Sequence, residues 1–440
     1  MTRRKIIISI VAVACGGIVF ALYHFISEPF RLLRREVALI RQDGDPAEWS
    51  EILAALPTVR DNAAPIYQQA FALLDEGTPA EKDAFSHFMR LNPQDHLKAD
   101  LQAVRRLLAK NRKALALVRQ AAQKPAVQFD VDWSDPLKAQ LPHYAPLRYC
   151  VRLLRAEGRL QKEAGDVEGG IATMRSALRI AKQIESEHPQ QVIGMLVRCA
   201  LSAIALQGFQ EILTDADASP QTYRALLQDL NGHDIKPTLI QAFRTDRCTT
   251  RFAFDLMRSG QAAEYASSSG DRAPRPRSLA FNPPALWWLA HEETFCLRLW
   301  RRLIQMSRQP GYDWQAFTVV EREAHQRFAF FALSRQLMPT FVRAYKKAAG
   351  VQARVDLLRL ALALRLYRHD HGAYPANLNA LQPQYLPAVP LDPFTNKPFV
   401  YRREGSGFLL YSFGENHRDD GGAFDPKLTP RDDVVWRSKR

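Results

Sequence analysis

The residues with the clearest capacity for chemistry lie between Gly414 and Asp432, where carboxylates surround paired glycines. Ca²⁺ takes about six to eight oxygen ligands, many of them backbone carbonyls that only a flexible loop can turn inward. The stretch does not match the EF-hand pattern, so a calcium site and a solvated acidic turn both stay open. The acidic residues and glycines of this stretch are Asp419, Asp420, Gly421, Gly422, Asp425 and Asp432.

Side chains suited to catalysis are scattered along the chain. The sequence has no Walker A loop, no GxGxxG and no GxSxG, and the run 291–293 (His-Glu-Glu) lacks the second histidine of a zinc-protease helix. His369 and His371 lie at a helix end, where capping or solvent exposure is the commoner role. A hydrolase cleft would need carboxylates that the fold brings together, and the candidates are Glu292, Glu293, Glu321 and Glu323.

The elements that would position the acidic stretch follow from periodicity. Apolar residues from Leu357 to Tyr367 recur at three and four, which predicts a helix ending near Gly372. Prolines at 375, 387, 390 and 393 then predict an ordered, extended connection. Strands at 398–403 and 408–413 form a hairpin, and a third strand at 433–436 closes a small antiparallel sheet.

This part of the chain resembles the globular part of the type II secretion major pseudopilins. The resemblance covers about the last 85 residues and is carried by Ala363, Tyr367, Gly372, Tyr374-Pro375, Leu381, Tyr385-Leu386, Pro390, Asp392-Pro393, Tyr401, Phe408, Tyr411-Ser412, Gly414, Asp420-Gly421-Gly422 and Asp432-Asp433. In that family the acidic loop before the last strand binds calcium. The resemblance therefore implies Asp420 and Asp432, with Asp419 and Asp433, as calcium ligands.

The chain also departs from the pseudopilin pattern. A pseudopilin begins with a short leader, a Gly-Phe processing site and a glutamate five residues into the mature helix. None of these features is at the start of this sequence. We therefore do not expect the module to join a pilus fibre.

The N-terminus predicts a membrane anchor. Residues Ile6 to Ile26 form a 21-residue run without a formal charge, which is long enough to span a bilayer. Basic residues at 3–5 favour a cytoplasmic N-terminus, although three arginines at 31–35 weaken the asymmetry. A cleaved signal peptide or a lipoprotein site at Cys15 is less expected, because the apolar run is long and continues past Cys15. We expect a single-pass inner-membrane protein with most of the chain in the periplasm.

From about Glu36 to Ala349 the pattern is helical, with apolar residues at three and four and prolines between segments. The unit from Leu153 to Pro189 resembles a tetratricopeptide-type hairpin with its turn at Gly165-Asp166. No second copy follows at the period of about 34 residues. A peptide-binding groove and an ordinary antiparallel helix pair both stay open, and we favour the helix pair.

The predicted fold is mainly α, with a small C-terminal α+β module. The expected divisions are an anchor at 1–28, a helical repeat-like domain at 29–260, a loop or linker at 261–284, a basic helical segment at 285–350 and a pseudopilin-like module at 351–440. Five aromatic residues follow the linker, and they suit helix packing better than lipid contact. They are Trp287, Trp288, Phe295, Trp300 and Phe317.

Charge and cysteines indicate partners only broadly. Between Arg298 and Asp370 there are fourteen Lys or Arg against five Asp or Glu, within a net charge of +14. Such a surface attracts anionic lipid, envelope polymer or acidic proteins, and nucleic acid is the less expected partner of an anchored chain. Cys150, Cys199, Cys248 and Cys296 have no metal-binding spacing, and a Cys150–Cys199 disulfide is one option outside the cytoplasm.

Two functions follow. The favoured one is a non-enzymatic envelope protein whose calcium-stabilised, pseudopilin-like module serves protein contact or assembly. The alternative is a membrane-anchored hydrolase with a cleft in its helical body.

Overall fold

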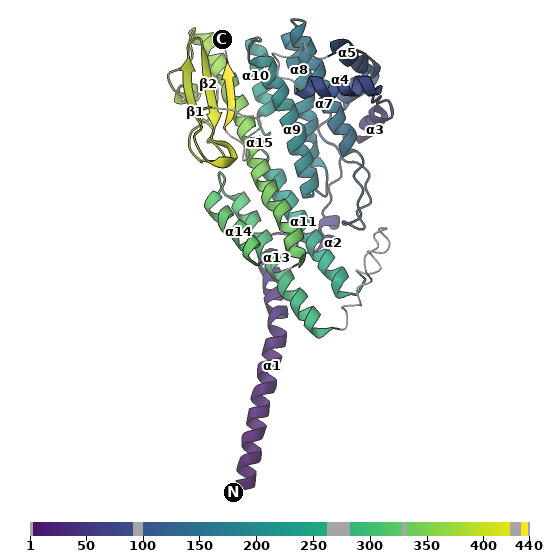
Figure 1. The fold of residues 1–440 in the computed structure, drawn as a ribbon, viewed down its shortest axis with the longest axis vertical. Helices are drawn as coiled ribbons and strands as arrows, with labels where there is room; N and C mark the ends of the chain where they lie inside the picture. Colours follow the sequence, from purple (N-terminus) through teal and green to yellow (C-terminus); the bar gives the residue numbers. More distant parts are fainter. Residues whose placement is uncertain (1–2, 91–99, 262–281, 328–331, 423–432, 439–440) are drawn as a thin grey trace. The chain divides into compact units, whose positions relative to one another are not determined.

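The computed structural model describes the backbone of residues 3–90, 100–261, 282–327, 332–422 and 433–438, and the side chains of 23–90, 100–261, 282–324, 341–422 and 433–438. The described chain is mostly helical and carries one three-stranded antiparallel sheet near its C-terminus, as predicted (Figure 1). It divides into two compact units. Unit 1 comprises residues 1–55, 243–306 and 315–339, and unit 2 comprises residues 56–242, 307–314 and 340–440.

Each unit is assembled from segments that are distant in sequence. Unit 1 contains α1 (Arg3–Gln42), α2 (Trp49–Ala54), nearly all of α13 (Pro283–Arg308) and most of α14 (Trp314–Arg327). Two helices, α11 (Lys236–Arg258) and α15 (Ala332–His371), contribute residues to both units. The remaining helices of unit 2 are α3 (Ala64–Ala72), α4 (Pro79–Arg90), α5 (Leu101–Lys110), α6 (Arg112–Ala121), α7 (Tyr144–Glu163), α8 (Val167–Gln183), α9 (Val192–Leu213) and α10 (Pro220–Leu230).

The predicted helical hairpin is the pair α7 and α8. Gly165 makes the turn at a left-handed φ of +87°, and Asp166 caps α8 by accepting a hydrogen bond from the Gly169 amide at 2.9 Å. A Cβ on Gly170 would lie 2.9 Å from the carbonyl oxygen of Gly158, so glycine is needed for the two helices to cross this closely. The likeness to a tetratricopeptide repeat stays a prediction.

Helix α9 packs against both members of this pair. Among the described residues it is also the one helix whose length and apolar composition would suffice to cross a membrane, and 61% of that apolar window is buried inside the molecule. A core helix meets the same criteria. The anchor predicted at Ile6–Ile26 belongs to the continuous helix α1, but most of its side chains lie outside the described residues.

The C-terminal sheet has the order β1 (Val400–Glu404), β2 (Gly407–Ser412) and β3 (Val434–Ser438). The three predicted strands are confirmed to within about two residues at each end. A two-residue turn joins β1 to β2, with Gly405 at a positive φ of 58° in its first position. Every residue of β2 is buried, so both faces of this central strand are covered.

One buried carboxylate fixes the approach to the sheet. Asp392 is 2% exposed, and its Oδ1 accepts hydrogen bonds from the Ser412 hydroxyl at 2.8 Å and the Phe394 amide at 2.9 Å. Its Oδ2 accepts from the Phe413 amide at 3.2 Å. Asp392 thereby ties the proline-rich connection to the end of β2. Asp392, noted in the sequence together with Pro393, therefore has a structural role.

In unit 1, the end of α1 is held by apolar contacts and an ion pair. Ile40 and Ala47 form a buried cluster with Leu297 of α13. Glu36 is 3% exposed and accepts a hydrogen bond from Arg301 Nε at 2.6 Å. Since an unpaired buried charge is costly, this pair fixes the register between the two helices.

The carboxylate of Asp356 on α15 should make the free energy of unfolding depend on pH. It accepts hydrogen bonds from Arg359 at 2.7 Å and Gln352 at 3.1 Å, yet burial raises its pKa to about 6. Unfolded aspartate titrates near pH 4, so the native state holds the extra proton between about pH 4 and pH 6. The free energy of unfolding should therefore fall by up to about 3 kcal/mol as the pH rises through that window.

Asp356→Asn removes this titration and should flatten the dependence. Urea unfolding of both proteins at about pH 4.5 and pH 7.5 measures the effect. Equal pH slopes for the two proteins would contradict the assignment to Asp356.

Candidate functional site

The segment from Gly414 to Gly422 follows β2 and carries Asp419 and Asp420, the first two predicted ligands. Asp419 Oδ1 accepts hydrogen bonds from the Tyr411 hydroxyl at 2.8 Å and from the Gly421 amide at 2.9 Å. Gly422 has a positive φ of 75°, which favours glycine, and a Cβ here would lie 2.8 Å from a methyl group of Leu409 on β2. The acidic segment is therefore pinned to the sheet at Asp419 and at Gly422.

Asp420 and Asp433 differ in their surroundings. Asp420 is exposed, and its Oδ2 accepts a hydrogen bond from Asn416 Nδ2 at 2.6 Å. Asp433 is 1% exposed, and its Oδ2 accepts from the Gly422 amide at 2.8 Å. Its other oxygen, Oδ1, is buried and has no hydrogen-bond partner within the described part of the chain.

The electrostatics of Asp433 reflect this position. Burial raises its pKa to about 6, and the negative charges of Asp420 and Asp419 add to the rise, while the amides of Gly422 and Asp420 oppose it. A buried carboxylate oxygen without a donor, close to two like charges, is stabilised by a bound cation. Oxygen ligands of this kind suit calcium.

The structure thus places three of the four predicted ligands, Asp419, Asp420 and Asp433, at the same edge of the module. Asp432 lies outside the described residues, as does Asp425. Over residues 23–90, 100–261, 282–324, 341–422 and 433–438, no group of three or more His, Cys, Asp or Glu side chains is arranged to hold a metal ion. Calcium binding at these positions stays a prediction.

Two of the four carboxylates proposed for a hydrolase are engaged in ion pairs. Glu292 and Glu293 of α13 are fully buried. Glu293 pairs with Arg251 at 3.1 Å and with Arg258, and Glu323 of α14 pairs with Arg302 at 2.5 Å. Their ion pairs stabilise unit 1, and this geometry does not favour the hydrolase alternative.

The histidines and cysteines have structural surroundings. His369 Nδ1 lies 2.9 Å from an oxygen of Asp370, and the rings of His371 and Tyr367 are 4.2 Å apart, on the exposed last turn of α15. The four described cysteines are buried, and Cys150 and Cys199 form no disulfide with each other. Burial raises the pKa of three of these thiols to about 12, which makes them poor nucleophiles. These are Cys150, Cys199 and Cys248.

The basic stretch is partly neutralised by acids from elsewhere in the chain. Arg301 pairs with Glu36, and Arg365 pairs with Asp217. These partners lie about 150 residues or more away in sequence, so a local count of charges could not include them. Three of the aromatic residues after the linker, Phe295, Trp300 and Phe317, are buried, in keeping with the packing interpretation.

Sequence reasoning missed a row of arginines on α7. Positions 148, 152, 155 and 159 carry arginine at spacings of four, three and four, which places them on one helix face. The spacing alone could have indicated a basic face on this helix. Its meaning depends on which of the four find acidic partners, and only the tertiary structure shows that.

A long helix followed by a small antiparallel sheet, with an acidic segment leading into the last strand, defines a pseudopilin-like module. The comparison with family models agrees: residues 340–429 match the model described as type II secretion system (T2SS), protein G. The match covers about a fifth of the chain and characterises its C-terminal module. Searches of curated proteins and of solved structures give no match.

Proposed function

We propose that this chain is a single-pass membrane protein of the bacterial cell envelope that serves type II secretion through protein contacts of its C-terminal module. The match of residues 340–429 to the T2SS protein G family carries the proposal. A helical body connected to such a module suits a role in assembly or display. The carboxylate of Glu293 in α13 forms ion pairs with Arg251 and Arg258, and this arrangement does not favour a catalytic role.

We also propose calcium as the ligand of the acidic segment, held by Asp419, Asp420, Asp432 and Asp433. Bound calcium would neutralise the clustered carboxylates and supply a partner for the buried oxygen of Asp433. The chain itself already fixes the segment through the hydrogen bonds of Tyr411 to Asp419 and of Gly422 to Asp433. The segment would then present a constant surface to partner proteins.

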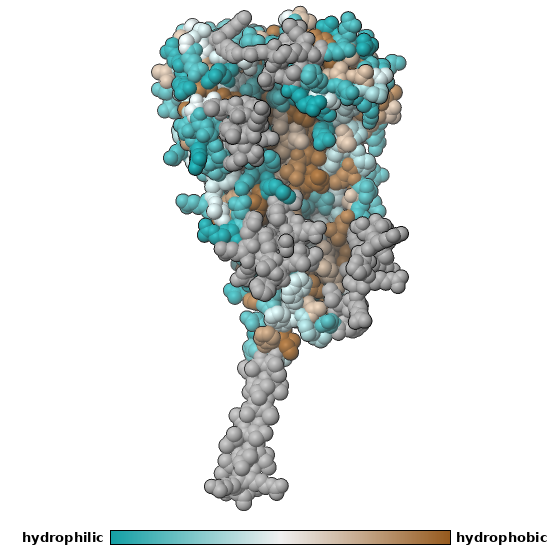
Figure 2. All heavy atoms as spheres, in the orientation of Figure 1, coloured by the Kyte–Doolittle hydropathy of each residue, from teal (hydrophilic) through white to brown (hydrophobic). Residues whose placement is uncertain are grey.

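Aromatic residues support a membrane interface next to the anchor. Tyr23, Phe25 and Ile26 are 69%, 59% and 53% exposed, and Figure 2 shows hydrophobic surface where the described part of α1 begins. The rings of Phe25 and Trp287 stack with centroids 5.2 Å apart, and Trp287 Nε1 donates to the Phe25 carbonyl at 3.0 Å. Aromatic side chains of this kind favour the lipid headgroup zone. We therefore place residues 23–26 and Trp287 at the bilayer surface.

A topology experiment tests the proposal. Alkaline phosphatase or green fluorescent protein is fused after Arg440, because phosphatase is active only outside the cytoplasm and the fluorescent protein reports the cytoplasm. We expect active phosphatase and a dark fluorescent fusion, with both fusions present in the membrane fraction. A fluorescent, phosphatase-inactive pair would contradict the envelope location and the calcium role.

A further inference from the structure

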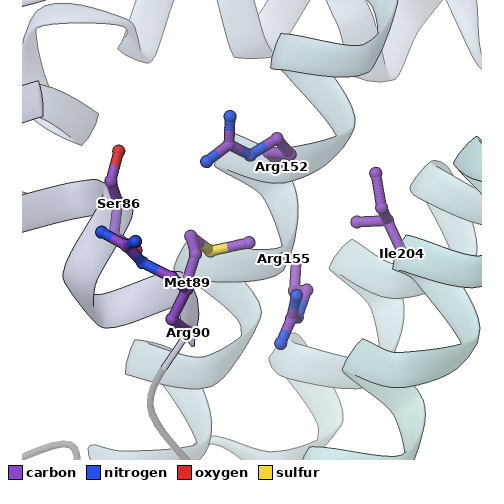
Figure 3. A pocket seen from close by; sticks show the side chains of 6 residues that line it. All are labelled: Ser86, Met89, Arg90, Arg152, Arg155 and Ile204. Atoms are coloured by element: carbon purple, nitrogen blue, oxygen red, sulfur yellow. The ribbon is translucent and has the colours of Figure 1, made fainter. Parts of the chain in front are cut away.

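Unit 2 contains a pocket of about 440 Å³ between α4, α7 and α9. Figure 3 shows Met89 of α4 and Ile204 of α9 on opposite sides of it, with the arginines around them. The volume lies in the range of small-ligand sites. The lining residues are Ser86, Met89, Arg90, Arg152, Arg155 and Ile204.

One of the three lining arginines has a carboxylate partner. Arg155 donates through Nε to Glu211 Oε2 at 3.0 Å, and both side chains are buried. Arg159, one turn further along α7, shares the same carboxylate at 3.8 Å and donates to the Phe88 carbonyl at 2.8 Å. A single negative charge, that of Glu211, thus serves two arginines.

The other two arginines of the pocket lack an acidic partner among the described residues. Arg90 Nε donates to the Ser86 carbonyl at 3.1 Å. Arg152 lies over the Phe85 ring, with its guanidinium carbon 5.1 Å from the ring centre. We take these two guanidinium groups as the donors that an anion would meet in the pocket.

The like charges on α7 carry a cost that a bound anion would relieve. Arg148 and Arg155 flank Arg152 at four and three residues, a spacing at which like charges destabilise a helix. After burial, their repulsion is the next cause that lowers the pKa of Arg152. Charge that is unfavourable in the free protein is a recurrent property of binding sites.

We propose that this pocket binds a carboxylate of an acidic peptide. Guanidinium groups form charge-assisted, bidentate hydrogen bonds with carboxylates, and Arg152 and Arg90 supply them from two helices. Met89 and Ile204 provide apolar contacts for a neighbouring aliphatic side chain, which an inorganic anion could not use. None of the residues that line this pocket belongs to the proposed calcium site or to the pseudopilin-like sheet.

The test uses the full chain in detergent and a fluorescein-labelled, amidated pentapeptide with two glutamates flanked by leucines. Fluorescence anisotropy measures its affinity, and the same peptide with glutamines is the probe control. Arg152→Gln should weaken binding of the glutamate peptide about tenfold or more, because it removes charge-assisted hydrogen bonds to the carboxylate. Arg112→Gln removes an exposed arginine of α6 outside the pocket and should change the affinity less than twofold.

Thermal unfolding without peptide separates binding from a structural role. Arg152→Gln should raise the melting temperature by relieving like-charge repulsion, whereas loss of a structural arginine would lower it. Should Arg152→Gln fail to fold, Arg90→Gln at the exposed rim provides the same binding test. Equal affinities for the glutamate and glutamine peptides, or equal losses in Arg152→Gln and Arg112→Gln, would overturn the proposal. Full displacement of the peptide by about 10 mM inorganic phosphate would overturn it in favour of a phosphate site.

Discussion

Asp433→Asn should abolish the stabilisation of this protein by calcium. Calcium sites in modules outside the cell bind with Kd values of about 10⁻⁴ to 10⁻³ M, so about 10 mM calcium should stabilise the wild type by about 1.4–2.7 kcal/mol. The introduced carboxamide would keep an oxygen for the Gly422 amide but lose the charge that attracts the cation. The variant should therefore melt at the same temperature with calcium and with chelator.

A second result is expected for Asp433→Asn when calcium is removed. Burial and the neighbouring aspartates raise the pKa of Asp433 to about 6, so its ionised form is unfavourable in the native state at neutral pH. In chelator at about pH 7.5, Asp433→Asn should melt at least as high as the wild type. A purely structural carboxylate would give the opposite sign.

Thermal melts monitored by circular dichroism, with calcium, magnesium or chelator, measure both effects. Asp83→Ala removes an exposed carboxylate of α4 and serves as the control that keeps the full calcium response. A calcium-induced shift in Asp433→Asn equal to that of the wild type would rule out this residue as a ligand. Asp420→Ala should also lose the response, because it removes a neighbouring ligand.

Arg365→Ala should destabilise the protein by about 1–3 kcal/mol, the cost of leaving a buried polar group without its hydrogen-bond partner. Arg365 of α15 is 3% exposed and pairs with Asp217. It also donates to the carbonyls of Leu213, the last residue of α9, and of Ala216 at 3.0 Å. A cation at this position satisfies carbonyls that the helix end leaves unpaired.

A matched control lies one turn further along α15. Arg368 contacts the same Asp217 at 2.7 Å but is 28% exposed in its side chain, so Arg368→Ala should cost less than about 1 kcal/mol. Arg365→Lys should give an intermediate loss of stability, because an ammonium group keeps the charge but lacks the planar, forked donors of the guanidinium group. Urea unfolding followed by intrinsic fluorescence ranks the three variants. Similar losses for Arg365→Ala and Arg368→Ala would contradict this account.

The sequence alone determined the elements whose signals are local. The positive φ that the turn requires at Gly405, the apolar run from Phe408 to Tyr411 in β2 and the glycine after α15 each depend on a few adjacent residues. The prediction of a helix and a three-stranded sheet was therefore confirmed. The resemblance of this stretch to the pseudopilins, carried by the order and spacing of its motif residues, agrees with the family match at 340–429.

Tertiary structure decided which charges meet. The sequence marks Glu293 as a possible catalytic carboxylate, and folding pairs it with Arg251 and Arg258 from another helix. Likewise it counts Arg365 within a basic surface, and folding buries it at the end of α9. The physical reason is that the pKa and the role of an ionisable group depend on its burial and on partners within a few ångströms, and residues distant in sequence supply both.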